Sequence, residues 1–175
     1  KQIGAKYGFV AMGLFQNEEE VANSPIIAGR MPLPGYIRYQ DRNGDGIISK
    51  EQDMGYIGKS ARPTHNGSLN LFGEWKGFDF DLLFSWGLGH EIALTGQYTA
   101  EDAAEAGTMD HTSFTKPFYQ KGNSPVYLVE NSWRPDNRDA DFPRLEVEGP
   151  NNQNGYSSTY WYRNGNYMRL KTAQI

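Results

Sequence analysis

Hydrophobic and polar positions alternate most regularly near the middle of the chain. Every second residue between 78 and 86 is apolar, namely Phe78, Phe80, Leu82, Phe84 and Trp86. The intervening set, Asp79, Asp81, Leu83, Ser85 and Gly87, is mostly polar. Because successive side chains of a β-strand point to opposite faces, this pattern predicts a strand with one apolar and one polar face.

The segment before this strand has the same period and predicts its antiparallel partner. Leu69, Leu71, Gly73 and Trp75 alternate there with Asn70, Phe72, Glu74 and Lys76. The two runs meet at residues 75–78, where a glycine predicts a tight hairpin turn. In a membrane barrel the apolar face of such a hairpin contacts lipid and its polar face lines a lumen. In a soluble sandwich the apolar face contacts a core instead, so the pattern leaves both settings open.

Short strands and long connections are predicted elsewhere. Further strands are expected at 7–16, 36–40 and 167–175, and loops rich in glycine and proline at 25–35 and 59–68. The strand at 167–175 is cut off by the end of the sequence, which predicts that the chain is a piece of a longer protein.

Helical signals are weak. Residues 88–155 show little regular pattern, apart from a helical turn or two at 101–106 and a short strand or helix at 125–130. The acidic run at 18–20 is expected to be a solvated charge cluster rather than a helix. No stretch approaches 18 apolar residues, so no transmembrane helix is predicted.

Composition narrows the classes of function. The 175 residues include 17 Lys and Arg against 21 Asp and Glu, for a net charge of −4, which argues against nucleic acid as a partner. The absence of cysteine excludes disulfides and thiolate metal sites. The 20 glycines, 9 prolines and 14% aromatic residues favour short strands with long connections over a helical bundle.

Aromatic residues gather near the end of the chain. Five of them fall within twelve positions, namely Tyr156, Tyr160, Trp161, Tyr162 and Tyr167. Tyrosine and tryptophan concentrate at membrane–water interfaces, because the amphipathic ring is half wet there. A core cluster or a sugar-binding cluster accounts for these residues equally well.

The clearest local chemical signal is the stretch DRNGDGIIS at residues 41–49. It carries side-chain oxygens at positions 1, 3 and 5, glycine at 6 for the tight turn and an apolar residue at 8, as in a Ca²⁺-binding loop. Ca²⁺ prefers six to eight oxygen ligands. The candidate ligands are Asp41, Asn43, Asp45, Ile47 through its backbone carbonyl, Ser49 and Asp53.

The end of this loop departs from the pattern. Gln52 stands at position 12, so Asp53 is the better carboxylate ligand only if the loop is one residue longer. The flanks are not predicted to be helical, which argues against a pair of EF-hands. A turn of Asp, Asn and Gly without metal remains the alternative.

No set of residues predicts catalysis. The three histidines, His65, His90 and His111, lack the spacing of a zinc site. The carboxylates at 18–20 and at Asp79 and Asp81 fit a solvated charge run and the polar face of a strand. No nucleophile motif or phosphate-binding glycine loop is present. We therefore predict that the chain is not an enzyme.

Several segments, taken in order, resemble one family. They are Tyr7–Phe9, Gly13–Gln16, Glu19–Val21, Pro34–Tyr39, Asp41–Gly46, Tyr56–Gly58, Trp75–Asp79, Trp133–Asn137, Phe142–Leu145, Ser157–Trp161 and Arg163–Lys171. In these residues the chain resembles the SusC/RagA family of TonB-dependent outer-membrane proteins of Bacteroidetes. The resemblance covers nearly the whole chain, but only a C-terminal slice of the family's architecture.

The resemblance implies an all-β fold, a segment of a barrel of about 22 antiparallel strands with long extracellular loops. Residues 1–175 would be a partial barrel domain without the plug domain and the last strands, and residues 36–58 a Ca²⁺-type loop insertion within it. The transporter would import glycan oligosaccharides or peptides in the bacterial outer membrane. Its partners would be a SusD-like surface lipoprotein, TonB, and the outer-membrane lipid.

This resemblance also assigns the two faces of the predicted hairpin. The turn at Lys76 and Gly77 would be periplasmic, and the loops at 41–53 and 88–155 extracellular. The apolar set on the strand would face lipid, whereas Asp79, Asp81 and Ser85 would face the lumen. The alternative from the residues alone is a soluble, Ca²⁺-stabilised, β-rich module that binds glycans.

Overall fold

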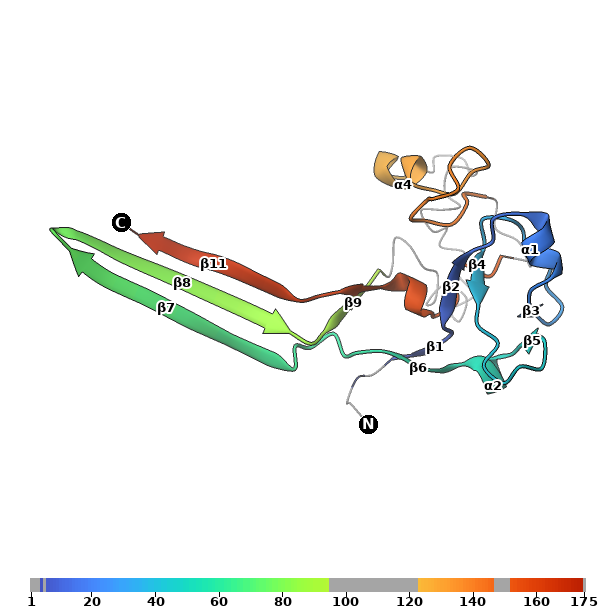
Figure 1. The fold of residues 1–175 in the computed structure, drawn as a ribbon, viewed down its shortest axis with the longest axis horizontal. Helices are drawn as coiled ribbons and strands as arrows, with labels where there is room; N and C mark the ends of the chain where they lie inside the picture. Colours follow the sequence, from blue (N-terminus) through green and yellow to red (C-terminus); the bar gives the residue numbers. More distant parts are fainter. Residues whose placement is uncertain (1–3, 5, 95–122, 147–151, 175) are drawn as a thin grey trace. The chain divides into compact units, whose positions relative to one another are not determined.

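The computed structural model in Figure 1 describes residue 4 and residues 6–94, 123–146 and 152–174. The predicted helical turn at 101–106 and His111 therefore lie outside the described residues. The chain forms two compact units, each assembled from segments that are distant in sequence. Unit 1 comprises Lys1–Lys6, Gly58–Ala93 and Tyr162–Ile175, and unit 2 comprises Tyr7–Ile57 and Leu94–Trp161.

Unit 1 is built on a three-stranded antiparallel sheet. Its central strand is β8 (Phe78–Leu88), which pairs with β7 (His65–Trp75) on one side and β11 (Tyr167–Gln174) on the other. The three strands run side by side as long ribbons in Figure 1. A separate pair joins β9 (Glu91–Ala93) to β10 (Tyr162–Asn164). The strand expected at the end of the chain is confirmed as β11.

The predicted hairpin is confirmed, and its first strand is longer than expected. β7 and β8 pair in continuous register from His65 opposite Leu88 to Trp75 opposite Phe78. The turn residues Lys76 and Gly77 both have positive φ, as a type I′ turn requires. The predicted loop at 59–68 was too long, because residues 65–68 join the strand although their own composition is polar and glycine-rich.

Unit 2 contains short strands. They are β1 (Lys6–Gly8), β2 (Ala11–Leu14), β3 (Ile26–Ile27), β4 (Ile37–Tyr39), β5 (Ile47–Ile48) and β6 (Gly55–Gly58). β1 pairs with β6, β2 with β4, and β3 with β5. The strand expected at 36–40 is confirmed as β4. The strand expected at 7–16 is divided into β1 and β2, with Phe9 in an isolated bridge to Ser158 between them.

The helices of unit 2 are short. Those within the described residues are α1 (Glu18–Ala22), α2 (Lys50–Asp53), α4 (Val126–Glu130) and the 3₁₀ turn η2 (Thr159–Trp161). The charge run at 18–20 is not buried, as expected, but the preference against a helix was wrong, because Asn17 caps α1 by accepting a hydrogen bond from Glu20 N. Three glutamates in the first turn also suit the positive end of the helix dipole. Among the described residues, no helix is long and apolar enough to cross a membrane.

Unit 2 encloses the hydrophobic core found in the described part of the chain. Its buried members are Phe9, Leu14, Ile37, Tyr39, Ile48, Leu128, Trp133, Phe142 and Trp161. Of the five clustered aromatic residues near the chain end, Trp161 is therefore a core residue, and the partly buried Tyr156 and Tyr160 pack against the core. Among the described residues, strands outnumber the short helices in both units, which agrees with the predicted all-β class.

Candidate functional site

The register of the three-stranded sheet gathers its apolar side chains on one face. Residues directly opposite each other in an antiparallel pair point to the same side. Leu69 of β7, Phe84 of β8 and Leu170 of β11 lie opposite one another, and Trp86 lies opposite Met168. The apolar face consists of Leu69, Leu71, Trp75, Phe78, Phe80, Leu82, Phe84, Trp86, Met168, Leu170 and Ala173.

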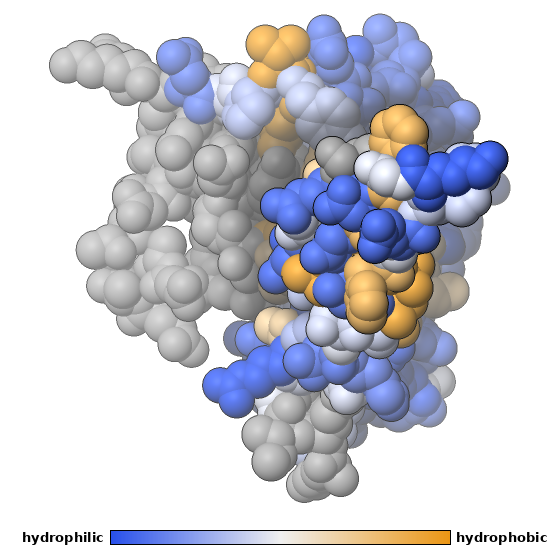
Figure 2. Space-filling view, turned by 90° about the vertical axis from the view of Figure 1, so that its left-hand side faces the viewer, coloured by the Kyte–Doolittle hydropathy of each residue, from blue (hydrophilic) through white to orange (hydrophobic). Residues whose placement is uncertain are grey.

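This apolar face is open rather than packed into a core. Leu69 is 48% exposed, Phe80 42% and Leu170 53%. Figure 2, which looks at the hairpin end, shows exposed apolar surface in orange next to hydrophilic surface in blue. Because a large exposed apolar patch is unfavourable in water, the face indicates contact with a membrane or a partner.

The opposite face of the same sheet is mostly polar. It carries Asn66, Ser68, Asn70, Phe72, Glu74, Asp79, Asp81, Leu83, Ser85, Arg169, Thr172 and Gln174. Asp79, Asp81 and Ser85 therefore lie opposite the apolar set, as the alternation predicted. Phe72 and Leu83 are the two large apolar residues among them. The sheet thus has one apolar face and one mostly polar face.

Aromatic rings cover two glycines on the apolar face. A Cβ placed on Gly67 would lie 2.5 Å from Cζ2 of Trp86, and one on Gly73 would lie 2.8 Å from Cε1 of Phe80. Each glycine stands opposite the aromatic residue that covers it. Rings that cover strand glycines shield the bare backbone and help fix strand register. This role of Gly67 was not recognised from the sequence, where it belonged to a predicted loop.

The dimensions of β7 and β8 fit a bilayer. Each strand has 11 residues. A membrane β-strand needs about 9–11 residues when it is tilted by about 45°. The sheet therefore combines the length, the alternation and the exposed apolar face of a membrane-spanning β-hairpin.

The loop at 41–53 is closed by carboxylates that accept backbone hydrogen bonds. Oδ1 of Asp41 accepts from Gly44 N at 2.6 Å, and Oδ2 accepts from Gly46 N at 2.7 Å. The bond from Gly46 lowers the pKa of Asp41 below its ordinary value of 3.8, and the bond from Gly44 adds to this effect. The acidic turn is therefore preorganised around an ionised Asp41.

Asp53 joins the two ends of this loop. Its side chain is fully buried, and its two oxygens accept from Arg42 N at 2.7 Å and Ser49 N at 2.8 Å. Ser49 in turn caps α2 by accepting from Gln52 N. The sequence identified Asp53 only as a candidate metal ligand, and its bridging of the loop ends was missed because the motif carries no signal for burial.

The donor set of the loop suits Ca²⁺ in chemical type, since every candidate ligand supplies a hard oxygen atom. Asp45 and Asn43 bond to each other through Asn43 Nδ2 and Asp45 Oδ2 at 2.8 Å, so their side chains share one side of the turn. In the described part of the chain, no three His, Cys, Asp or Glu side chains are grouped in a way that would hold a metal. The calcium site therefore stays a prediction.

Comparison with known proteins found three similar receptors from the bacterium Formosa agariphila. TonB-dependent receptor P39 is 23% identical over 212 aligned positions that cover all of this chain. TonB-dependent receptor P3 is 28% identical and TonB-dependent receptor P26 24% identical, covering 99% and 96% of the chain. The chain is thus similar to one part of these TonB-dependent receptors. No family model and no solved structure matches it.

The chain spans only 15–18% of the length of these TonB-dependent receptors. The similarity therefore concerns one part of each receptor. Within this chain it extends over both units. The relatives carry the name of receptors rather than of enzymes.

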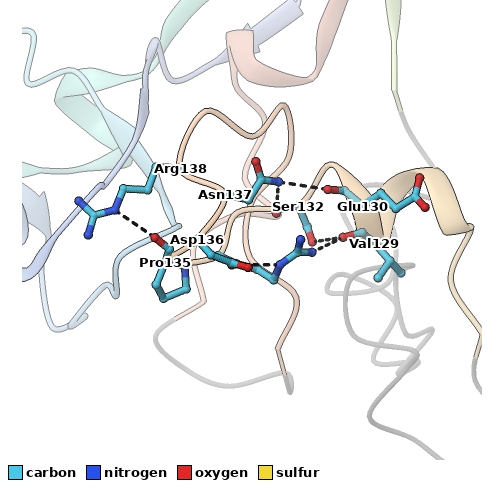
Figure 3. Close-up of polar contacts among 8 residues, drawn as sticks. Val129, Glu130, Ser132, Pro135, Asp136, Asn137 and Arg138 are labelled. Carbon is cyan, nitrogen blue, oxygen red and sulfur yellow. Dashed lines mark hydrogen bonds and ion pairs between the residues drawn. The ribbon is translucent and has the colours of Figure 1, made fainter.

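One segment of the resemblance to the TonB-dependent receptors, residues 133–137, has a clear structural role (Figure 3). It satisfies the carbonyl groups at the end of α4. Arg134 Nη1 donates to Val129 O at 2.8 Å, and Asn137 Nδ2 donates to Glu130 O at 3.1 Å. Ser132 Oγ also donates to Val129 O. Because the last carbonyls of a helix lack intrahelical partners, these side chains stabilise the end of α4.

Trp133 connects this segment to the core of unit 2. Its ring is buried, and its Nε1 donates to Oε1 of Gln16 at 3.0 Å. Gly35 has a φ of 91°, and a Cβ on it would lie 2.5 Å from Cε3 of Trp133. Only glycine suits both that backbone conformation and that close approach. The motif therefore acts in packing, and its sequence alone did not indicate whether it had a structural or a binding role.

The histidines do not form a site among the described residues. His65 is exposed at the start of β7, whereas His90 is buried beyond the end of β8. His90 packs edge-on against Tyr167.

Proposed function

We propose that the chain forms part of the membrane barrel of a TonB-dependent transporter. The observation that carries this proposal is the exposed apolar face of the β7–β8–β11 sheet, backed by a polar face on the same strands. The kinship with TonB-dependent receptors, which are outer-membrane proteins, places the chain in the outer membrane. The apolar face contacts lipid, and the face with Asp79, Asp81 and Ser85 lines the barrel interior.

The orientation, partners and cargo follow from the SusC/RagA resemblance and belong to this proposal. The turn at Lys76 and Gly77 is short, as periplasmic turns of outer-membrane barrels are. The loop at 41–53 is then extracellular, on the side where a SusD-like lipoprotein covers the barrel. TonB supplies the energy through other parts of the protein, and the cargo is an oligosaccharide or a peptide.

The soluble glycan-binding module is supported less well. A soluble β-module needs its apolar face buried, as the inner faces of a sandwich are. In the part of unit 1 that the structure describes, Leu69, Phe80 and Leu170 remain about half exposed. A membrane supplies the missing apolar surroundings without a further protein layer.

The barrel proposal can be tested with fluorophores attached to single cysteines. The chain has no native cysteine, so each introduced thiol is unique within it. Probes at residues 80, 82 and 84 should be quenched by lipids with brominated acyl chains in the full-length, membrane-inserted protein. Probes at the adjacent residues 81, 83 and 85 should be quenched much less. Equal quenching of both sets, or no quenching of either, would contradict the proposal.

We also propose that the loop at 41–53 binds Ca²⁺ through Asp41, Asn43, Asp45, Ile47 O, Ser49 and Asp53. The support is the oxygen-only donor set and the preorganised turn around Asp41. Removal of Ca²⁺ with EDTA should then speed proteolysis within residues 36–58, and added Ca²⁺ should reverse the effect. Magnesium at the same concentration serves as the control. Identical cleavage with and without EDTA would contradict bound Ca²⁺.

A further inference from the structure

The turn of the long hairpin has an unexpected residue at its first position. Lys76 has a φ of 51° and Gly77 a φ of 86°. A type I′ turn needs positive φ at both positions, which suits Asn, Asp or Gly at the first. Positive φ is unfavourable for a long side chain such as lysine. Turn formation therefore does not account for Lys76, and a backbone outlier of this kind points to a role for the side chain.

The ammonium group of Lys76 lies over the ring of Trp75. Its Nζ is 4.7 Å from the ring centroid of Trp75, which belongs to the apolar face of the sheet. Glu74 and Asp79 stand opposite each other on the other face. In the part of the chain that the structure describes, Lys76 nevertheless makes no ion pair with either carboxylate. The cation is thus held by an aromatic ring, with its remaining donors free for another acceptor.

Two exposed aromatic residues form the apolar face of the hairpin tip. Trp75 and Phe78 are directly opposite in register, and each is 68% exposed. A tryptophan ring has an apolar body and one polar N–H group, which suits the boundary between hydrocarbon and water. The exposed surface at this end of the molecule is seen in Figure 2.

We propose that the hairpin tip, residues 75–78, binds the phosphate group of a membrane phospholipid. Lys76 supplies the cation, and Trp75 and Phe78 lie among the headgroups and the upper acyl chains. This inference rests on the proposed barrel function, which brings the tip to a membrane surface. The tip then fixes the depth at which β7 and β8 cross the bilayer.

Charge complementarity selects a phosphate headgroup as the occupant. The cation lies over the ring of Trp75 and the two rings share one face, so a ligand must offer a negative oxygen next to apolar groups. A phospholipid headgroup joined to acyl chains has this arrangement. Free inorganic phosphate offers the oxygen alone, and it gives Trp75 and Phe78 no apolar contact.

The test compares lipids with and without phosphate. The full-length protein and its variants Lys76→Asn and Lys76→Arg are inserted into vesicles of phosphatidylcholine and phosphatidylglycerol, or of digalactosyl diacylglycerol with the same acyl chains. The readout is the folding equilibrium constant from unfolding in urea. Lys76→Asn should lower this constant about fivefold in phospholipid, as loss of one cation near a membrane surface predicts, and not in galactolipid. Lys76→Arg should keep the wild-type value in both.

Two results would overturn the inference. The first is a Lys76→Asn variant as stable as the wild type, or more stable, in phospholipid, which is what turn preference alone predicts. The second is full recovery of the lipid effect when inorganic phosphate is added to galactolipid vesicles, which would assign the site to free phosphate. If bromolipid quenching at residues 82 and 84 persists in either case, the inference fails while the barrel proposal stands. Loss of that quenching would reject the barrel proposal itself.

Discussion

Replacing an apolar-face residue of β8 with arginine should destabilise the protein to an extent set by its depth in the bilayer. Phe78, Phe80, Leu82, Phe84 and Trp86 sample one face at regular steps. Two residues advance a strand by about 7 Å. At a tilt of about 40°, this step is about 5 Å along the bilayer normal.

The magnitude follows from this geometry. With Phe78 at the interface, Leu82 lies about 10 Å deep and Phe84 about 15 Å deep, on either side of the middle of an apolar band about 25 Å tall. Arginine costs about 2–4 kcal/mol at the midplane and about 0–1 kcal/mol near the interface. Leu82→Arg should therefore lower the folding equilibrium constant by about 30-fold to about 700-fold, and Phe78→Arg by less than about tenfold.

The assay is the folded fraction of the full-length protein in vesicles, followed by urea titration and by heat-modifiable migration on gels. Asn70→Arg is the matched control. Leu71 stands opposite Leu82, so the neighbouring Asn70 lies at nearly the same depth as Leu82, but it faces the other side of the sheet. If arginine lowered the stability equally at every position from Phe78 to Trp86, the lipid-facing assignment would be refuted. An Asn70→Arg variant as damaging as Leu82→Arg would refute it as well.

The remaining predictions concern unit 2. Gly35→Ala should destabilise it by about 1–3 kcal/mol, because the new Cβ is forced against the buried indole of Trp133. Gly29→Ala, at a similar positive φ in open space, should destabilise it less. Thermal unfolding monitored by tryptophan fluorescence compares the two variants. Asp53→Asn, measured in EDTA, should lower the free energy of unfolding by about 1–3 kcal/mol, because an amide keeps only one of the two acceptor oxygens that the loop ends use. If Asp53→Asn were as stable as the exposed control Glu51→Gln, this role of Asp53 would be contradicted. The pKa of Asp41 is lowered, so the stabilisation that its carboxylate gives the turn is present above pH 3.8 and is lost as the pH falls through the lowered pKa. NMR shifts of the turn amides measure this transition, and a change between pH 5 and 7 instead would oppose the assignment.

The sheet was predictable from the sequence because one of its faces is uniformly apolar. Alternation from Phe78 to Trp86 fixes a period of two, and Gly77 marks the turn. The first residues of β7 were missed, since Asn66 and Ser68 belong to the polar face and Gly67 carries no side chain. Their strand conformation depends on pairing with β8, which local composition does not encode.

The loop at 41–53 shows a different limit. Its acidic positions were identified by spacing, and the turn around Asp41 follows from the same residues. The burial of Asp53 was not predictable, because it depends on how the two ends of the loop meet. The helical conformation of residues 18–20 was missed for a local reason: the capping residue Asn17 lies just before them.

Apolar side chains are buried in unit 2 but exposed on the sheet of unit 1, and this difference concerns how the sheet is stabilised. In unit 2 the apolar side chains are buried against one another, so the unit can be stable in water. In unit 1 the apolar face is open, and within the described residues β7 and β11 each pair with a neighbour on one side only. Unpaired strand edges are not tolerated in the hydrocarbon of a membrane, so a barrel must supply further strands at both edges. On the barrel proposal, stability of the sheet therefore depends on lipid and on neighbouring strands, whereas unit 2 has its own buried core.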